Sequence, residues 1–183
     1  LLKGERVLAS LQAVFEDVAI EKLPIAYTAV ATDLKHEQEI LFREGGLYEA
    51  IRASIAIPGV FTGIDRKGEF LVDGGVLNPI PINHVQHRDN LIIAVNLDGI
   101  PDLTKVGFPK KLNTIALMQE SYYAMRRKLS ALSIELYKPD YVIHVPHNIS
   151  GIWDFDRSTD LIEQGYQLAK SALADVAQAA NLD

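Results

Sequence analysis

The residues that most constrain the fold lie at positions 70–81, where a short apolar run ends in Asp-Gly-Gly and two prolines follow. The run 70–72 predicts a buried strand, so Asp73 stands at a strand end, a common place for a catalytic side chain on a rigid scaffold. Gly74 and Gly75 allow a positive φ and a close approach by another backbone or a substrate. An Asp-Gly pair is also a common turn signal, and this stretch alone favours an ordinary turn.

The composition is that of a globular protein. The chain has 183 residues, of which 48% are hydrophobic and 23% are charged, which fits one domain and argues against disorder. A net charge of −6 offers no basic surface, so nucleic acid is not an expected partner. The absence of cysteine excludes disulfides, thiolate nucleophiles and Cys-ligated zinc, and it fits a cytoplasmic location. No apolar run approaches the roughly 20 residues that a membrane span needs.

Apolar periodicity predicts alternating strands and helices. Helices are expected at 5–17, 47–54, 82–88, 112–137 and 160–180, and strands at 25–33, 39–43, 60–64, 69–72, 91–97 and 141–145. This alternation predicts an α/β domain with a mostly parallel, helix-covered sheet, and the 60–72 hairpin adds an antiparallel element near Asp73. The continuous apolar run 91–97 is typical of a strand covered on both faces. Because no linker or internal repeat interrupts the chain, we expect one domain over residues 1–183.

Two motifs together are more specific than either one alone. Arg-Ala-Ser-Ile-Ala-Ile-Pro-Gly at 52–59 is followed by Asp-Gly-Gly-Val-Leu-Asn-Pro-Ile-Pro at 73–81. In this order they resemble the patatin-like phospholipase family, most closely its bacterial branch, and Ala-Thr-Asp-Leu at 31–34 and Trp-Asp-Phe-Asp at 153–156 extend the resemblance. The resemblance covers essentially the whole chain but only the later part of the family's catalytic domain. Since the chain begins at Leu1 without a methionine, we expect the N-terminal part of that domain to be absent.

The resemblance implies a three-layer α/β sandwich and a lipid acyl-ester hydrolase with a Ser-Asp dyad and no metal or cofactor. In that family the serine lies in a Gly-x-Ser-x-Gly elbow, a glycine-rich loop forms the oxyanion hole, and the aspartate of Asp-Gly-Gly takes the serine proton without a histidine. Asp73 occupies the place of this aspartate. Gly74 and Gly75 support it, and Ser54 and Pro58 belong to a segment that shapes the site.

The chain also departs from the family pattern. It has no Gly-x-Ser-x-Gly elbow and no Gly-Gly-x-Arg/Lys loop. Ser54 lacks flanking glycines, so we do not expect it to be the nucleophile. The glycine pair at 45–46 precedes a helix and could act as an oxyanion loop. A turn that starts the helix is the simpler interpretation. We therefore predict that this chain alone does not hydrolyse esters.

Other functions are compatible with the same residues. The missing elbow favours a non-catalytic patatin fold kept as a binding or regulatory module. A nucleotide- or phosphate-binding α/β domain is a weaker alternative, because no Gly-x-Gly-x-x-Gly or P-loop stands at a strand-to-helix junction. The expected partners are a lipid or other ester substrate, a membrane surface contacted transiently, and a second copy of the chain. Tyr122, Tyr123 and Trp153 favour core packing, with an acyl pocket as the alternative.

The histidines and one basic cluster complete the set of candidate residues. His84 and His87 are expected on a helix surface, and His144 and His147 are expected to be partly buried. Their spacing with the carboxylates completes no known metal site. The basic cluster at 126–128 predicts a solvated helix face, with a phosphate-headgroup contact as the alternative.

Overall fold

The chain divides into two compact units, Leu1–His84 and Val85–Asp183, and each is described by itself. The computed structural model describes residue 9 and residues 16–85, 90–102, 104, 113–151 and 154–174. The helix predicted over residues 5–17 therefore lies almost entirely outside the described residues. The expectation of a single domain stays a prediction.

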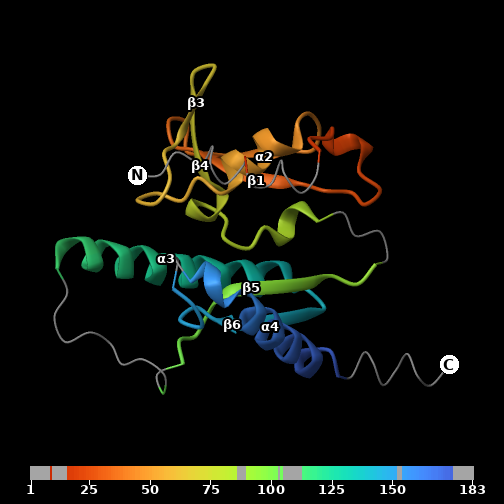
Figure 1. The fold of residues 1–183 in the computed structure, drawn as a ribbon, viewed down its shortest axis with the longest axis vertical. Helices are drawn as coiled ribbons and strands as arrows, with labels where there is room; N and C mark the ends of the chain where they lie inside the picture. Colours follow the sequence, from red (N-terminus) through yellow and green to blue (C-terminus); the bar gives the residue numbers. More distant parts are fainter. Residues whose placement is uncertain are drawn as a thin grey trace. The chain divides into compact units, whose positions relative to one another are not determined.

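The first unit is built on a four-stranded antiparallel sheet in the order β2-β1-β4-β3 (Figure 1). The antiparallel hairpin predicted near Asp73 is confirmed as β3–β4, but its first strand covers Ile64–Arg66 instead of the predicted 60–64. Its turn holds Lys67 and Gly68 at φ values of 47° and 93°. Two consecutive residues with positive φ are typical of a tight hairpin whose twist matches that of its strands. The four strands are β1 (Ala29–Asp33), β2 (Gln38–Phe42), β3 (Ile64–Arg66) and β4 (Glu69–Asp73).

The core of this unit lies between the sheet and α2 (Leu47–Ser54). Every residue of β1 is buried, as expected of a central strand. Ala50 and Ala53 on α2 and Leu71 on β4 are buried in the same cluster. Alanines at these positions let the helix approach the sheet closely, and burying a leucine such as Leu71 contributes about 1.5–3 kcal/mol. This packing fixes the end of β4, where Asp73 lies.

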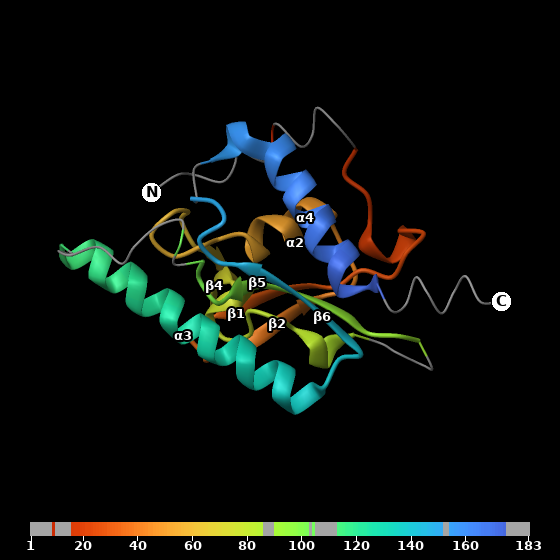
Figure 2. The same cartoon turned by 90° about the horizontal axis from the view of Figure 1, so that it is seen from below.

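The second unit contains two parallel strands, β5 (Ile93–Gly99) and β6 (Tyr141–Pro146), connected through the long helix α3 (Thr114–Tyr137). Parallel strands need such a crossover. The Asn113 side chain caps α3 by accepting a hydrogen bond from the Ala116 N–H at 2.8 Å. Figure 2 shows the β5–β6 pair between α3 and α4 (Ser158–Ala172).

Strand β5 corrects one expectation. Ala94 and Asn96 are buried, but Ile93, Val95 and Leu97 are 48%, 51% and 63% exposed. Neighbouring side chains of a strand point to opposite faces. Arg126 and Ser130 of α3 bind Asp98, which shares a face with Ala94 and Asn96, so α3 packs on that face. The prediction that both faces of this strand are covered is therefore wrong within its own unit.

The remaining predicted elements are confirmed in part. The helices predicted at 47–54 and 112–137 are confirmed as α2 and α3. The helix predicted at 82–88 is described only as a short 3-10 helix, Ile82–His84, and the later part of the helix predicted at 160–180 lies outside the described residues. The α/β class is confirmed with mixed sheets. Among the described residues, parallel pairing is confined to β5 and β6. A three-layer sandwich with a mostly parallel central sheet therefore stays a prediction. No helix in this part of the chain is long and apolar enough to cross a membrane.

Candidate active site

Asp73 is the last residue of β4 and lies opposite Ala31 of β1 in the antiparallel pairing. Its backbone N–H donates a hydrogen bond to the carbonyl oxygen of Ala56 at 3.1 Å. Ala56 belongs to the motif at 52–59, so this bond connects the two motifs that the sequence analysis paired. Asp73 is thus held from two sides, by β1 and by the segment that follows α2.

The Asp73 carboxylate is oriented by its own loop. Its Oδ1 accepts a hydrogen bond from the Gly75 N–H at 2.6 Å, which caps the short 3-10 helix Gly74–Val76. A backbone donor to a carboxylate makes a charge-assisted bond, which is shorter and stronger than a neutral one. Asp73 is half-buried. A fixed, partly accessible carboxylate can accept a proton from a hydroxyl placed beside it.

Gly74 lacks a side chain because β1 lies directly against it. A Cβ at this position would lie 2.4 Å from the Val30 carbonyl oxygen. The Gly74 carbonyl oxygen also accepts a hydrogen bond from Thr32 Oγ1 at 3.4 Å. The predicted close approach is confirmed at Gly74. Neither Gly74 nor Gly75 uses the positive φ that a glycine allows, because the loop enters a 3-10 helix, whose φ values are negative.

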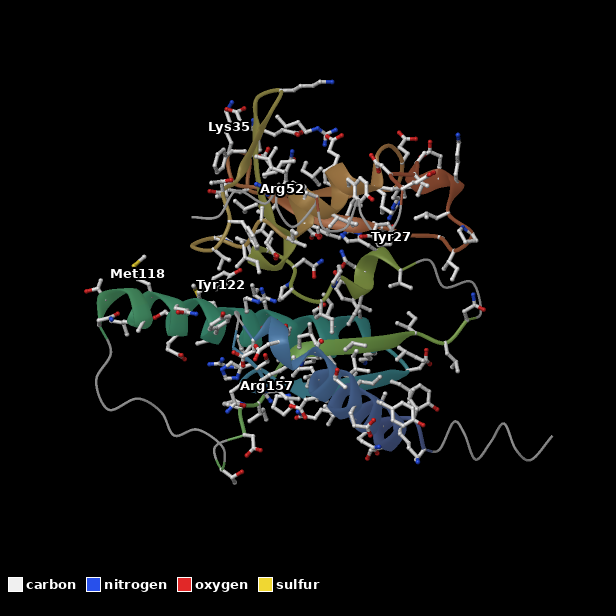
Figure 3. All side chains as sticks on the ribbon, in the orientation of Figure 1. Tyr27, Lys35, Arg52, Met118, Tyr122 and Arg157 are labelled. Carbon is white, nitrogen blue, oxygen red and sulfur yellow. The ribbon has the colours of Figure 1, made fainter. Side chains whose placement is uncertain are left out.

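Ser54 and Pro58 belong to the segment that contacts Asp73 through Ala56. Ser54 is the last residue of α2 and is half-buried, whereas Pro58 is exposed. Arg52 (Figure 3) closes the segment, because its Nη2 donates to the backbone oxygen of Thr62 at 2.9 Å and to the Thr62 hydroxyl at 3.1 Å. The structure therefore gives this segment a defined shape. That Ser54 shapes the site without being the nucleophile stays a prediction.

The glycine pair at 45–46 starts α2. Gly45 has a φ of 89°, and its N–H donates to Glu21 Oε2 at 2.9 Å. In the first turn of the helix, the Tyr48 N–H donates to Asp17 Oδ1 at 3.1 Å. These N–H groups already have carboxylate acceptors within the protein. The geometry therefore favours the helix-start interpretation over an oxyanion loop.

A polar cluster that no sequence motif indicated tethers the loop that follows Asp73. The Asn78 amide donates to Glu39 Oε2 at 3.0 Å, and His84 Nε2 lies 2.7 Å from the same oxygen. The His84 side chain is only 19% exposed, so its expected place on a helix surface is wrong. His87 lies outside the described residues. No local pattern could have revealed this cluster, because Glu39 and His84 are 45 positions apart.

A second strand-end carboxylate, Asp33 at the end of β1, has a structural role. Its Oδ1 accepts hydrogen bonds from the backbone N–H groups of Lys35 and Phe70, each at 3.0 Å, and its Oδ2 is hydrogen-bonded to His36 Nδ1. Burial acts to raise the pKa of Asp33, but these hydrogen bonds outweigh it and hold the pKa below its ordinary value. Both oxygens serve to fix the β1–β2 turn against β4.

The second unit has a third strand-end carboxylate, Asp98 on β5. Arg126 donates to it from Nε at 3.2 and 3.3 Å and from Nη2 at 3.1 Å, and Ser130 Oγ donates at 3.2 Å. The Arg126 guanidinium lies 5.8 Å from the centre of the Tyr122 ring (Figure 3). Burial acts to lower the pKa of Arg126, but the Asp98 carboxylate outweighs this and raises it. Asp98 therefore joins β5 to α3.

The basic cluster at 126–128 only partly follows the expectation of a solvated face. Lys128 is exposed as predicted, but Arg126 and Arg127 are partly buried, because α3 packs this side against β5. His147 is partly buried as predicted, and burial together with the nearby Arg127 charge lowers its pKa. His144 is exposed, which corrects its prediction. Within the described ranges, no group of three or more histidine and acidic side chains is placed to hold a metal ion.

Comparison with known proteins finds similarity to the patatin-like phospholipase family and to NTE family proteins. The model of the family described as "Patatin-like phospholipase" matches residues 1–85, a range that includes Asp73 and the motif at 52–59. An uncharacterized NTE family protein of Mycobacterium tuberculosis is 46% identical over 100 residues, which is 54% of this chain and 28% of that protein.

Two further relatives extend the similarity. Another uncharacterized NTE family protein, from Mycobacterium bovis, is 29% identical over 192 residues and aligns with 94% of this chain. A protein of Kluyveromyces lactis named as a lysophospholipase is 27% identical over 100 residues, 54% of this chain and 7% of its own length. The chain spans 28% and 33% of the length of the two mycobacterial relatives. The resemblance predicted from the motifs is confirmed, and residues 1–85 match the patatin-like phospholipase family.

Proposed function

We propose that this chain is the aspartate-bearing part of a lipid acyl-ester hydrolase domain and that Asp73 is the base of a Ser-Asp dyad. The observation that carries the proposal is the placement of Asp73. Its carboxylate is fixed at a strand end by the Gly75 N–H, and its backbone is bonded to the second family motif. Both features lie within the residues that match the family model.

The proposed reaction is an acyl transfer through a serine ester. The serine Oγ attacks the carbonyl carbon of the lipid ester while the base accepts the hydroxyl proton. The alcohol then leaves with a proton, and water hydrolyses the acyl-serine to release a fatty acid. An aspartate with an ordinary pKa of about 3.9 is a weak base, so desolvation, which raises the pKa of a carboxylate, must assist it. Each oxyanion-hole donor would contribute about 3 kcal/mol.

In this proposal the serine and the oxyanion loop come from residues that precede Leu1 in a longer protein. The chain itself holds no Gly-x-Ser-x-Gly segment, so we propose that it is inactive alone. The relative named as a lysophospholipase supports lysophospholipids as a substrate class. The β5–β6 pair between two helices supports a three-layer fold with a mostly parallel sheet in the complete domain (Figure 2). A cytoplasmic location, transient membrane contact and homo-oligomers stay predictions.

One observation favours a second candidate, a non-catalytic patatin fold that binds lipid or regulates a partner. The same missing elbow that makes this chain inactive alone is what such a module would show.

Labelling with a fluorophosphonate, which reacts with activated serines, separates the two functions. We expect no stoichiometric labelling of the 183-residue chain and one labelled serine, upstream of Leu1, in the longer protein. Labelling of Ser54 in the 183-residue chain would contradict the missing-serine proposal. A longer protein that resists labelling and lacks ester turnover would support the binding module.

A further inference from the structure

The second unit contains a pocket of about 450 Å³ that the proposed reaction does not use. It lies where β5 and β6 end against α3. The carboxyl ends of parallel strands are a general place for ligands in α/β proteins. Apolar side chains form much of its wall, and the polar groups are few, which is typical of small-molecule sites. The apolar lining includes Ile100, Ala131, Ile134 and Pro146.

The one carboxylate in the wall is already neutralised. Asp98 lines the pocket, but both of its oxygens accept hydrogen bonds from Arg126, and Oδ2 also accepts one from Ser130. The ion pair removes the negative charge that would otherwise repel an anion.

Arg127 supplies a positive charge that this pair does not neutralise. It lines the pocket, and its Nη1 is buried without a hydrogen-bond partner among the described residues. A buried donor left unpaired costs free energy, and more so when it is charged. An anion in the pocket would give this guanidinium the acceptor it lacks, with the directional geometry that arginine offers to a carboxylate.

His144 adds a neutral donor to the same wall. Asn96 Oδ1 accepts a hydrogen bond from the Asp98 N–H at 3.0 Å. This bond orients the Asn96 amide so that its Nδ2 lies 3.2 Å from His144 Nδ1. Because Nδ2 is only a donor, Nδ1 of His144 must be the acceptor, and the ring proton of the neutral imidazole is then on Nε2. The polar side of the pocket therefore presents donors, which suits an anionic head group.

We propose that this pocket binds an amphiphilic carboxylate of the fatty-acid class, with the carboxylate on Arg127 and the apolar chain against Ile100, Ala131 and Ile134. The match of an apolar wall to a guanidinium whose buried Nη1 has no partner among the described residues carries this inference. The choice of a fatty acid as the natural ligand rests on the proposed function, because a fatty acid is the product of that reaction. The pocket would then be a site where product binds, separate in its residues from Asp73.

Titration calorimetry on the 183-residue chain tests the proposal with decanoate as the probe, kept below the concentration at which it forms micelles. We expect one saturable site for decanoate and no comparable binding of decanol or inorganic phosphate. Arg127→Gln should weaken decanoate binding by about 10-fold or more, because a charge-assisted hydrogen bond is lost. Ala131→Phe, at an exposed position on α3 that lines the pocket, should also weaken binding by filling the space for the chain.

Lys128→Gln is the matched control, because it removes the same charge from the next, exposed position of α3. It should change decanoate binding by less than about twofold. An equal loss in Lys128→Gln and Arg127→Gln would overturn the site in favour of non-specific attraction. Tighter binding of decyl phosphate than of decanoate would overturn the carboxylate assignment in favour of a phospholipid head group. Circular dichroism of each variant confirms that it is folded.

Failure of this inference and failure of the proposed function are distinguishable. The titration needs no ester turnover. If decanoate does not bind, the pocket proposal is wrong, but the proposal that Asp73 is the base is not affected. Binding that depends on Arg127 would stand even if the longer protein hydrolysed no ester.

Discussion

Asp73 and Asp98 both lie at the end of a strand, yet their surroundings give them different roles. Asp98 is 8% exposed and accepts hydrogen bonds from the Arg126 guanidinium and the Ser130 hydroxyl. Asp73 is half-buried, and its carboxylate is oriented by the Gly75 N–H of its own loop. An aspartate bound by a guanidinium through both oxygens serves packing. One that is oriented by its loop and partly accessible can serve chemistry.

A strand-end aspartate is therefore not a catalytic signal by itself. What distinguishes Asp73 is the glycine loop around it, in which Gly74 lies against the Val30 carbonyl, and the bond from its backbone to Ala56. What distinguishes Asp98 is a partner 28 positions away on α3.

The largest expected effect on stability is at Asp98. Asp98→Ala leaves the Arg126 guanidinium partly buried without its partner, and we expect the free energy of unfolding to fall by about 3–5 kcal/mol. Urea denaturation measures the change. Asp65→Ala, at an exposed position of β3, is the control and should stay within about 0.5 kcal/mol. A loss below about 1 kcal/mol in Asp98→Ala would show that the Asp98–Arg126 pair does not stabilise the fold.

A smaller effect is expected at the loop that holds Asp73. In Gly74→Ala the new methyl group would meet the Val30 carbonyl oxygen at 2.4 Å, so β1 or the loop must shift, at a cost of about 1–3 kcal/mol. Thermal and urea unfolding measure this loss. Gly165→Ala is the matched control, because open space surrounds Gly165 on α4. Alanine there should stabilise the protein by up to about 1 kcal/mol. Equal behaviour of the two variants would show that the loop is not packed as described.

The smallest effect on stability is expected at the polar cluster behind the loop. Asn78→Ala removes the amide that donates to Glu39 Oε2, and a loss of about 0.5–1.5 kcal/mol is expected because the bond is only partly buried. Asn90→Ala, at an exposed position, should be neutral in the same urea titration. If Asn78→Ala were also neutral, the cluster would not be tethering the loop.

Local signals predicted the elements around Asp73 well. Helix α2 has the predicted bounds, because a glycine pair precedes it and Pro58 limits its extension. The β3–β4 hairpin was predicted from a polar turn at 65–68, although Asp65 and Arg66 belong to β3 and the turn itself is shorter. The resemblance implied that the segment at 52–59 shapes the site, and a hydrogen bond from the Asp73 N–H to the Ala56 carbonyl oxygen connects the two motifs.

Features that depend on distant partners could not be predicted. The apolar run in β5 does not reveal that α3 covers only one of its faces. The surroundings of His84 depend on Glu39, and those of Arg126 depend on Asp98, so neither pair forms a local pattern. The pocket beside Arg127 likewise arises only when β5, α3 and β6 come together.

The role of Asp73 as the base is tested by the kcat/KM of Asp73→Asn in the longer protein that carries the serine. Asparagine keeps the shape and can still accept the Gly75 hydrogen bond, so we expect the free energy of unfolding to change by less than about 1 kcal/mol. Because the amide cannot accept the serine proton, kcat/KM should fall by about 10²–10⁴-fold, while Asp65→Asn should leave it unchanged. A folded Asp73→Asn variant that keeps its kcat/KM within about threefold of the unmodified protein would show that Asp73 is not the base.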